Sequence, residues 1–448
     1  MTRSERRRIP CSPGGCPRLH KRMAAAAALL LALTASGCGS SAAPGTEETD
    51  GQVELRFSWW GNSDRAELTQ RAIDTFEDAH PNITVKPEFA DFNGYFDRLA
   101  TTVAGGDAPD VITLGGAYPR EYGDRGALMD LTEVSGELDL GKLPESALAN
   151  GNFSGIQYGV PTGNNTYALL INPRVFEEAG VPLPDEDTWS WEDYAETAEA
   201  ISAKSPDGVF GTADPTSMEA LDVYAWQNGE SVYSEDGGMN IEAETLADWW
   251  DMTAELRASG AAPDAALSAE LDGLAGPEQS LMGRGLSGME FAWSNQYAAY
   301  QSASGDPLQL IRPPGESHAQ PGVWLQASQI YSIYSQTEHP KEAAALIDFL
   351  INDPEAAKII GTDRGIPSNP DVLEAIQPEL TEAQQVESQF VGRMGEYANR
   401  PLIIGPVGST NTLQILERVN SGVLFEQITP EEAGKQFIDE VSAAIGAK

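Results

Sequence analysis

The order of apolar and polar positions in the first part of the chain alternates between strand and helix patterns. Residues 53–60 alternate like a strand and stop at Gly61-Asn62, and residues 66–80 have the apolar spacing of a helix that ends before Pro81. A strand begins at residues 83–85, an amphipathic helix covers 95–104, and 110–114 reads as the next strand. This order predicts an α/β layer built on a largely parallel sheet.

A second set of elements follows. Residues 167–172 predict a strand, and 175–179 predict a short helix. Residues 191–203 predict a helix with Ser190 as its N-cap and Asp193 in its first turn. Two further helices, 341–351 and 355–360, are separated by Asp353-Pro354, where the proline starts the second one.

The first 37 residues have the composition of a secretory signal. A basic stretch precedes an apolar run at 24–35, which is shorter than the ~20 residues that cross a bilayer as a helix, and small residues lead to Cys38. Ala35-Ser36-Gly37-Cys38 resembles the lipobox of bacterial lipoproteins, with Ala35 where leucine is usual. The resemblance implies lipidation of Cys38; ordinary secretion with an unmodified Cys38 is the alternative. Since the other two cysteines lie in the signal, no disulfide is expected.

The lengths of the remaining segments predict a tether and a large folded body. Residues 38–52 are rich in Ser, Ala, Pro, Gly and Thr without apolar periodicity, which is typical of a flexible tether. The body of roughly 400 residues exceeds the ~250–300 at which single cores stop growing, so at least two lobes are expected.

The charge balance excludes one class of partner. The chain has 28 Lys and Arg against 68 Asp and Glu, a net charge of −40, so nucleic acid is not expected to bind. A solvated acidic surface explains this charge, and a cationic ligand is compatible with it but not required.

Enzyme and cofactor motifs are weak. The stretch 283–288 spells a dinucleotide fingerprint but leads into a strand-like segment instead of opening a helix. His80, His318 and His339 are isolated, so no zinc site is expected, and there is no phosphate-binding Walker loop or Gly-x-Ser-x-Gly elbow. Carboxylates are too numerous for any pair to indicate glycoside hydrolysis. We expect a protein that is not an enzyme and has no cofactor.

Tryptophans stand beside amides at the ends of three predicted elements: residues 59–62, 226–229 and 293–295. An indole ring covers the C–H face of a sugar, and carboxamides hydrogen-bond its hydroxyls. Any single tryptophan is more often part of a core, but three such groups favour a site assembled from loops.

From about Val53 onward the chain resembles the family-1 extracellular solute-binding proteins of ABC importers, the group of sugar- and maltose-binding-protein-like lipoproteins. The stretches that carry the resemblance are 105–111 (GGDAPDV), 126–131 (GALMDL), 158–161 (YGVP), 170–180 (LINPRVFEEAG), 188–193 (TWSWED), 339–344 (HPKEAA) and 365–368 (GIPS). Each is weak alone, and their order and spacing together are specific.

The resemblance implies a two-lobed α/β periplasmic-binding-protein fold of the class II type, in which each lobe is a mixed, mostly parallel sheet flanked by helices. Hinge crossings are expected near 161–167, 325–328 and 367–371. The implied organisation is signal 1–37, tether 38–52, first lobe 53–164 and 327–370, and second lobe 165–326 and 371–448.

The resemblance also implies a ligand held between the lobes. Carried over residue by residue, the expected ligand-binding set is Trp59, Trp60, Asn62, Asp91, Tyr95, Tyr118, Asn164, Asn165, Trp226, Gln227, Asn228, Trp293, Asn295, Trp324 and Arg364. Glu230 stands where the family usually has a second glycine after Trp-Gln-Asn-Gly.

The function implied is the solute-binding subunit of an ABC importer. It would sit on the outer face of the cytoplasmic membrane, held there only by its lipid anchor, as a monomer that binds a sugar or oligosaccharide and delivers it to the permease transmembrane subunits by hinge closure. The alternatives are a secreted carbohydrate-active hydrolase, a binding protein for a non-sugar solute, and a surface adhesin or sensor of the same fold.

Overall fold

The computed structural model describes residues 51–116, 118–272, 276–315, 321–398 and 403–446. The predicted signal, Cys38, most of the tether and His318 lie outside the described residues. None of the described helices combines the length and the apolarity needed to cross a bilayer.

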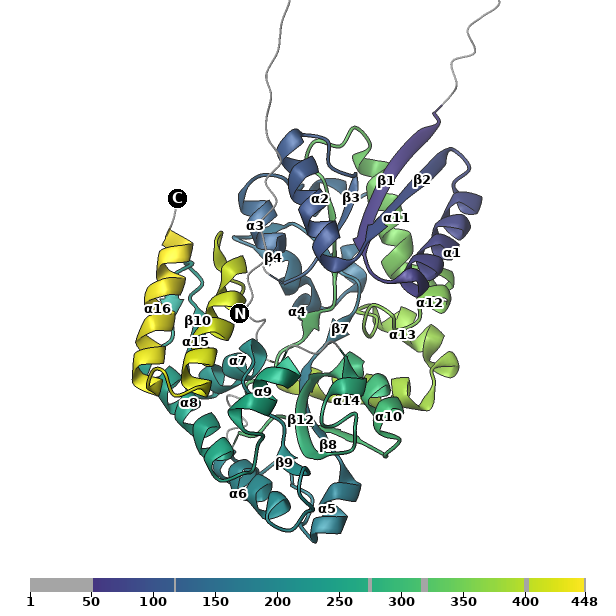
Figure 1. Ribbon diagram of the computed structural model, residues 1–448. Helices are drawn as coiled ribbons and strands as arrows, with labels where there is room; N and C mark the ends of the chain where they lie inside the picture. Colours follow the sequence, from purple (N-terminus) through teal and green to yellow (C-terminus); the bar gives the residue numbers. More distant parts are fainter. Residues whose placement is uncertain (1–50, 117, 273–275, 316–320, 399–402, 447–448) are drawn as a thin grey trace, which may run out of the picture. The chain divides into compact units, whose positions relative to one another are not determined.

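The first sheet has five strands (Figure 1). Their order is β2 (Ile83–Ala90), β1 (Val53–Trp60), β3 (Val111–Leu114), β15 (Ile330–Ile333) and β6 (Val160–Pro161). Strand β1 runs parallel to both β2 and β3, whereas β15 runs antiparallel to β3 and to β6. The strand from residue 330 therefore returns to a sheet begun almost 300 residues earlier in the sequence.

The helices beside this sheet begin at side-chain caps. α1 (Ser63–Ala79) starts after Asn62, whose side chain accepts a hydrogen bond from the backbone N–H of Arg65 at 2.9 Å, and α2 (Phe92–Gly105) starts after Asp91, which caps Gly94. These caps explain why both helices begin three residues before the predicted starts at 66 and 95. Three further helices are α3 (Tyr118–Asp124), α11 (Pro340–Asn352) and α12 (Pro354–Ile360). The predicted start of α12 at Pro354 is confirmed, with Asp353 as its cap.

The second sheet has four strands in the order β13 (Gln309–Ile311), β8 (Tyr167–Ile171), β12 (Ser287–Trp293) and β9 (Phe210–Thr212). All five residues of β8 are buried, because successive side chains enter two different cores on the two faces of the sheet: Leu169 and Ile171 in one, Ala168 and Leu170 in the other. The apolar run that predicted this strand therefore reflects a sheet covered on both sides.

Helices surround the second sheet as well. They are α5 (Pro173–Ala179), α6 (Trp191–Ser202), α7 (Met218–Gln227), α8 (Ala243–Ala258), α9 (Ala265–Asp272) and α10 (Tyr297–Ser304). The predicted cap of α6 is confirmed as a capping box, in which the Ser190 hydroxyl accepts from the Asp193 N–H and the Asp193 carboxylate accepts from the Ser190 N–H. Other short elements include α4 (Glu145–Leu148), β4 (Asn152–Phe153), β5 (Ile156–Gln157), β10 (Ser231–Tyr233) and β11 (Met239–Asn240).

The α/β fold class is confirmed, but fewer strand pairs are parallel than expected. In the second sheet β8 is antiparallel to both β12 and β13, and only β9 runs parallel to β12. The physical reason is the connectivity. Strands β15 and β8 enter their sheets from the connecting segments and not through the right-handed helical crossover that makes neighbouring strands parallel.

Two of the segments predicted to cross between the lobes are paired with each other, and the chain next to the third, at Ile366, one residue before the predicted 367–371, is bonded to the same strand. β7 (Asn164–Asn165) pairs antiparallel with β14 (Gln326–Ala327), and Asn164 exchanges two backbone hydrogen bonds with Ile366, at N–O distances of 2.7 and 3.0 Å. Close backbone approach requires glycine beside this pair, since a Cβ on Gly365 would lie 2.1 Å from the Ser328 hydroxyl oxygen, and its φ is +84°.

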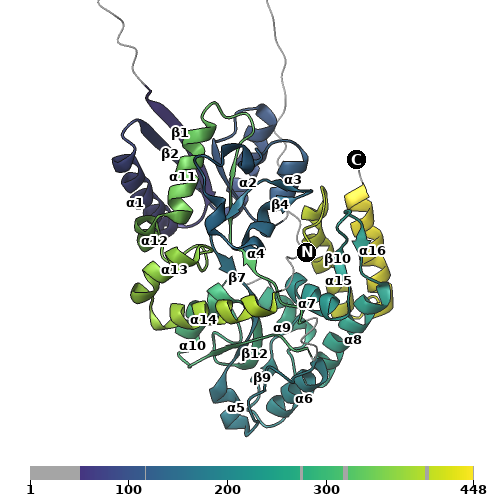
Figure 2. The ribbon, with the colours of Figure 1, turned by 180° about the vertical axis from the view of Figure 1, so that it is seen from behind.

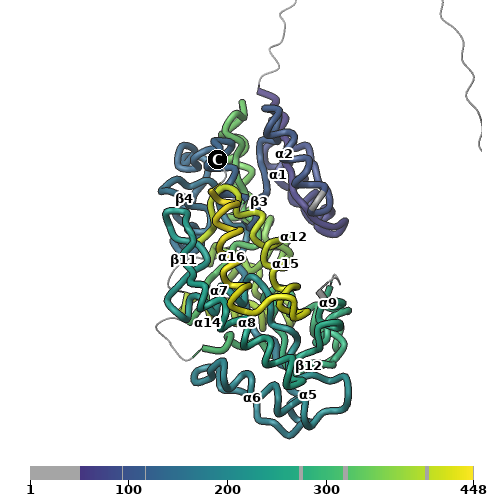
Figure 3. Tube along the Cα trace, turned by 60° about the vertical axis from the view of Figure 1, so that its left-hand side comes forward, coloured from purple at the N-terminus to yellow at the C-terminus, as the bar shows by residue number. Residues whose placement is uncertain are grey.

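The C-terminal helices divide between the two sheets. Seen from behind in Figure 2, α13 (Pro370–Ile376) packs on α12 beside the first sheet, while α14 (Glu382–Tyr397) packs on α10 and β13 beside the second. α15 (Thr412–Leu424) and α16 (Pro430–Gly446) pack with α8 (Figure 3). The predicted lobe boundary at residue 371 falls inside α13, and the boundaries as numbered remain predictions.

Candidate functional site

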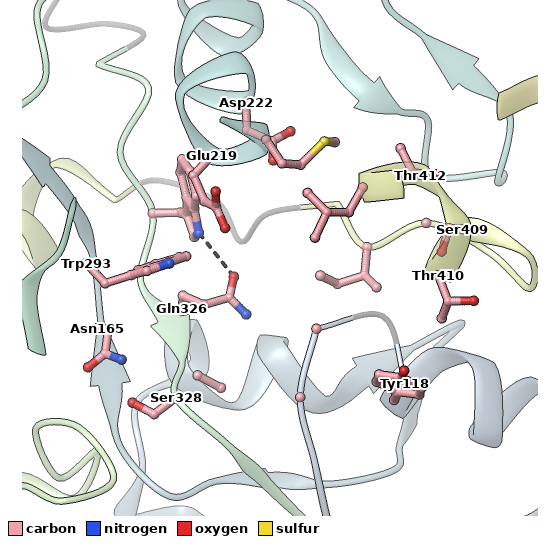
Figure 4. Close-up of a pocket in the computed structure, with 18 of the residues that line it drawn as sticks. Tyr118, Asn165, Glu219, Asp222, Trp293, Gln326, Ser328, Ser409, Thr410 and Thr412 are labelled. Carbon is pink, nitrogen blue, oxygen red and sulfur yellow. Dashed lines mark hydrogen bonds between the residues drawn. The ribbon is translucent and has the colours of Figure 1, made fainter. Parts of the chain in front are cut away.

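A cavity of about 550 Å³ lies at the ends of both sheets (Figure 4). The strands β1 and β12 each end there in a tryptophan, Trp60 and Trp293. The crossing strands contribute Asn165 and Gln326. The remaining walls come from α7 and from residues 403–413, so segments far apart in the sequence share one pocket.

The Trp60 ring is held by other aromatic side chains on the first-sheet side of the pocket. It packs against Phe92, Tyr95 and Phe96 at centroid distances of 5.6, 5.8 and 5.4 Å, and Phe96 in turn stacks on Tyr118 at 3.8 Å. The opposite aromatic wall is Trp293, which lies edge-on to Tyr167 at 5.4 Å and to Trp324 at 6.2 Å. Both Trp60 and Trp293 remain partly exposed, so their faces are accessible from the cavity.

Carboxamides and hydroxyls lie between these aromatic walls. Asn165 and Ser328 are lining residues whose side-chain oxygens are buried and accept no hydrogen bond from the described residues. Gln326 accepts a hydrogen bond from the indole N–H of Trp324 at 3.1 Å, which orients its amide group. Asn295 and Gln296 complete the amide set. These groups can exchange hydrogen bonds with a ligand that carries hydroxyls.

Two carboxylates reach the cavity from α7. Glu219 lies in the first turn of this helix, after the Ser217 cap, and Asp222 follows one turn later. Burial raises the pKa of the Glu219 carboxyl. Burial, with a smaller contribution from repulsion by Glu219, raises the pKa of Asp222 well above its ordinary value.

Residues 403–413, which run into the first turn of α15, close the side of the cavity opposite Trp293. Among them, Ser409, Thr410, Thr412 and Leu413 line the pocket. The Thr412 hydroxyl is hydrogen-bonded to the hydroxyl of Tyr233 at 2.5 Å. The guanidinium of Arg120, on α3 beside the first sheet, donates to the backbone carbonyl of Ile404. This last contact joins the two walls of the cavity.

A sequence profile described as bacterial extracellular solute-binding protein matches residues 71–387, more than half of the chain. The chain belongs to this family.

The chain is also similar to several known proteins and solved structures. An uncharacterized lipoprotein in the oleD 5′ region of Streptomyces antibioticus is 24% identical over 368 residues, covering 79% of this chain and 78% of the relative. A family-1 extracellular solute-binding protein from Alicyclobacillus acidocaldarius is 28% identical, with a TM-score of 0.71 and coverage of 89% of this chain and 100% of that one. An ABC substrate-binding protein from Listeria monocytogenes, in complex with cycloalternan, is 24% identical with a TM-score of 0.71 and the same coverage.

Six of the expected ligand-binding residues of this solute-binding protein line the pocket: Trp60, Tyr118, Asn165, Trp293, Asn295 and Trp324. Five of them expose part of a side chain or direct a polar group toward the cavity. Trp324 differs, because its ring is fully buried and supports the wall from behind.

The other nine lie outside the lining and have structural contacts. Trp59 and Trp226 are core residues, 0% and 3% exposed, and Tyr95 braces the first sheet through a 2.8 Å hydrogen bond from its hydroxyl to the Thr113 carbonyl oxygen. Asn62 and Asp91 cap α1 and α2, and Asn228 ends α7.

The last three brace neighbouring segments. Gln227 accepts a 2.6 Å hydrogen bond from the Trp191 indole and donates to the Pro314 carbonyl. Arg364 donates to the hydroxyls of Tyr331 and Thr69 inside the first lobe. Asn164 is engaged through its backbone with Ile366.

The sequence reasoning missed both carboxylates of α7, the residues Gln326 and Ser328, and the whole 403–413 segment. One signal pointed to Glu219 and Asp222: they stand one turn apart in an otherwise apolar helix, MEALDVYAWQ. No local pattern marks residues 403–413, because their position depends on how α15 packs against α8 and α16.

Proposed function

We propose that this solute-binding protein is the extracytoplasmic receptor of an ABC importer, which captures a sugar or oligosaccharide in the pocket and releases it chemically unaltered. The observation that carries the proposal is the pairing of Trp60 and Trp293, indoles from the ends of two different sheets, around one cavity that also holds carboxamides. Flat apolar faces with amides between them fit a ligand whose ring has an apolar face and hydroxyl edges. The Listeria structural neighbour, an ABC substrate-binding protein bound to cycloalternan, supports the same class of function.

We propose that the protein closes on its ligand about a hinge, and the connecting segments support this. The sheets are connected by narrow segments, β7, β14 and the stretch around Ile366, which are the elements able to absorb a change of backbone angle. A solute held by both Trp60 and Trp293 interacts more strongly with the closed form than with the open one, so it shifts the population toward closure. The permease subunits would recognise that closed form, and lipidation of Cys38 would keep the receptor beside them.

The position of the carboxylates favours binding over hydrolysis. Glycoside hydrolases place two carboxyl groups on either side of the scissile bond, about 5–10 Å apart. Glu219 and Asp222 project from adjacent turns of one helix and so approach a ligand from the same wall. We therefore propose that the protein is not an enzyme.

Calorimetry with a panel of mono- and oligosaccharides tests the proposal. We expect micromolar or tighter binding of at least one saccharide and a decrease in the radius of gyration, measured by small-angle X-ray scattering, when it is added. Chromatography after prolonged incubation should return the bound saccharide uncut. Cleavage of the saccharide would exclude a pure receptor, and binding of a peptide with no affinity for any saccharide would exclude the proposed ligand class.

A further inference from the structure

The described lining of the pocket contains two carboxylates and no side chain of opposite charge. Among the described residues that line it, Glu219 and Asp222 are the charged side chains, and no lysine, arginine or histidine is present. The two carboxylates would therefore repel an anionic solute and attract a cationic one.

Asp222 is left without a protein partner. Its side chain is only 7% exposed, and within the part of the chain that the structure describes it forms no ion pair and no hydrogen bond. Two other acids beside the second sheet are paired: Asp214 with Arg257 at 3.1 Å, and Glu290 with the hydroxyl of Tyr300 at 3.0 Å. The buried Glu387 also has an oxygen without a partner among the described residues, but it does not line the pocket, whereas Asp222 does. A buried carboxylate is costly unless a partner satisfies it, so the unpaired position of Asp222 points to a group supplied by the ligand.

Glu219 differs from Asp222 in one respect. The Trp293 side chain, which lines the same side of the cavity, lowers the pKa of the Glu219 carboxyl and opposes the larger effect of burial. The two acids repel each other across one helical turn, and this repulsion contributes to the raised pKa of Asp222. A hydroxyl can donate a hydrogen bond to such a pair but leaves its charge unchanged, whereas a bound ammonium group reduces the repulsion as well.

The aromatic residues add a second attraction for a cation. Trp293 is partly exposed on the side of the cavity that Glu219 also reaches, and the buried Trp324 supports it from behind, with ring centroids 6.2 Å apart and ring planes nearly perpendicular. An ammonium group near an indole face is attracted by the ring quadrupole. The amides Asn165 and Gln326 lie on the same cavity and remain available to hydroxyls.

We propose that the pocket selects a saccharide that carries a free, protonated amino group, with Asp222 and Glu219 as its counter-charge. This inference rests on the proposed function, because it specifies which sugars the receptor takes. Neutral sugars of the same shape bind more weakly, and uronates or sugar phosphates are rejected.

Matched pairs of ligands test the inference by isothermal titration calorimetry. The pairs differ only in an amino group for a hydroxyl: glucosamine and glucose, galactosamine and galactose, mannosamine and mannose, and the chitosan disaccharide and cellobiose. We expect at least one amine to bind about tenfold or more tightly than its hydroxyl partner, and glucuronate not to bind. The N-acetylated form of the preferred amine, which has lost the charge, should bind like the hydroxyl partner.

The outcomes separate the inference from the proposed function. Hydroxyl sugars that bind as tightly as their amines overturn the inference and leave the receptor assignment standing. Binding of a linear diamine with no binding of any saccharide overturns both, as does an absence of binding by every sugar in both sets.

Charge-removing variants of the same shape locate the effect. Glu219→Gln and Asp222→Asn should each weaken binding of the preferred amine about tenfold or more and change that of its hydroxyl partner by less than about threefold. Glu196→Gln, on the exposed side of α6, removes an equal charge away from the pocket and should change neither. Equal losses for amine and hydroxyl sugars in a variant whose circular dichroism is native would contradict the inference. If Asp222→Asn fails to fold, the affinities of Glu219→Gln for the preferred amine and for its hydroxyl partner decide between the two outcomes.

Discussion

Trp226 packs edge-on against Trp324, with ring centroids 5.6 Å apart and ring planes at 84°. Both rings are buried, and Trp324 stands between Trp226 and the cavity wall. Trp226, which the sequence placed in the ligand-binding set, therefore does not line the pocket. It packs behind Trp324, which in turn supports the cavity wall.

We predict that Trp226→Ala mainly lowers stability. The change removes a large side chain from the cluster of Tyr167, Val223 and Trp324, and core truncations of this size cost about 3–5 kcal/mol. Chemical denaturation should show this loss. Trp293→Ala is the contrasting variant. The Trp293 ring is partly exposed to the cavity, so its removal takes away contact with the ligand but little core packing. We expect the binding free energy to weaken by about 1–3 kcal/mol, with a small change in unfolding free energy. Reversed effects would show that Trp226, and not Trp293, contacts the ligand.

Removing the contact between the two cavity walls should favour the open form. Arg120→Ala deletes the hydrogen bond from the guanidinium to the Ile404 carbonyl. We expect the ratio of closed to open protein to fall roughly fivefold, corresponding to about 1 kcal/mol. Fluorescence energy transfer between labels on the two lobes measures it. Arg125→Ala is the matched control, since Arg125 pairs with Glu121 on the same side of the cavity. An unchanged transfer efficiency in Arg120→Ala would show that the contact does not hold the walls together.

The crossing segments should tolerate no side chain at Gly365. Alanine there would combine a positive φ of +84° with a Cβ 2.1 Å from the Ser328 hydroxyl oxygen and 2.9 Å from the Asn165 side-chain oxygen. We expect Gly365→Ala to lower the unfolding free energy by about 2 kcal/mol or more and to weaken ligand binding, because Asn165 must shift. Gly180→Ala has a similar φ of +62° with open space around the added methyl group, so it isolates the backbone strain. Equal losses in the two variants would mean that crowding at the hinge is unimportant.

A buried acid on α14 should make stability depend on pH. Burial raises the pKa of Glu387 to about 7, and one of its carboxyl oxygens has no hydrogen-bond partner among the described residues. Because the folded pKa lies above the unfolded one, protonated Glu387 stabilises the fold at low pH, and this contribution is lost as pH rises from about 4.5 through 7. Glu387→Gln should therefore be more stable than the unmodified protein at pH 8, by on the order of 2 kcal/mol, and similar at pH 5. Thermal denaturation at the two values checks this.

The exposed acid Glu396 on the same helix provides the control for that experiment. In Glu396→Gln, the difference in unfolding free energy between pH 5 and pH 8 should be the same as in the unmodified protein. A pH dependence that survives in Glu387→Gln would assign it to other groups, of which Glu290 is the first candidate, since burial raises its pKa to about 7 as well.

Much of the local structure could be predicted because it depends on near neighbours in the chain. Apolar spacing fixed the type of most long elements, and the cap of α6 at Ser190 and the start of α12 at Pro354 follow from hydrogen bonds within one turn. The predicted starts of α1 and α2 were less accurate. Asn62 and Asp91 cap first turns that contain few apolar residues, so the apolar spacing did not reveal where these helices begin.

The site was predicted in part. The sequence drew attention to aromatic residues at strand ends, of which Trp60 and Trp293 line the pocket, but it could not choose between Trp59 and Trp60. Adjacent residues of a strand point to opposite faces, and both faces of β1 are covered, so only the packing decides that Trp59 enters the core and Trp60 reaches the cavity.

What the sequence by itself determined is therefore the family, the alternation of strands and helices, and the presence of indoles and amides where elements end. The tertiary structure decided which of them meet. Glu219, Gln326 and Thr412 are far apart along the chain and become neighbours of one cavity through strand pairing at β14 and helix packing at α15. Such contacts depend on long-range burial, which no local spacing records.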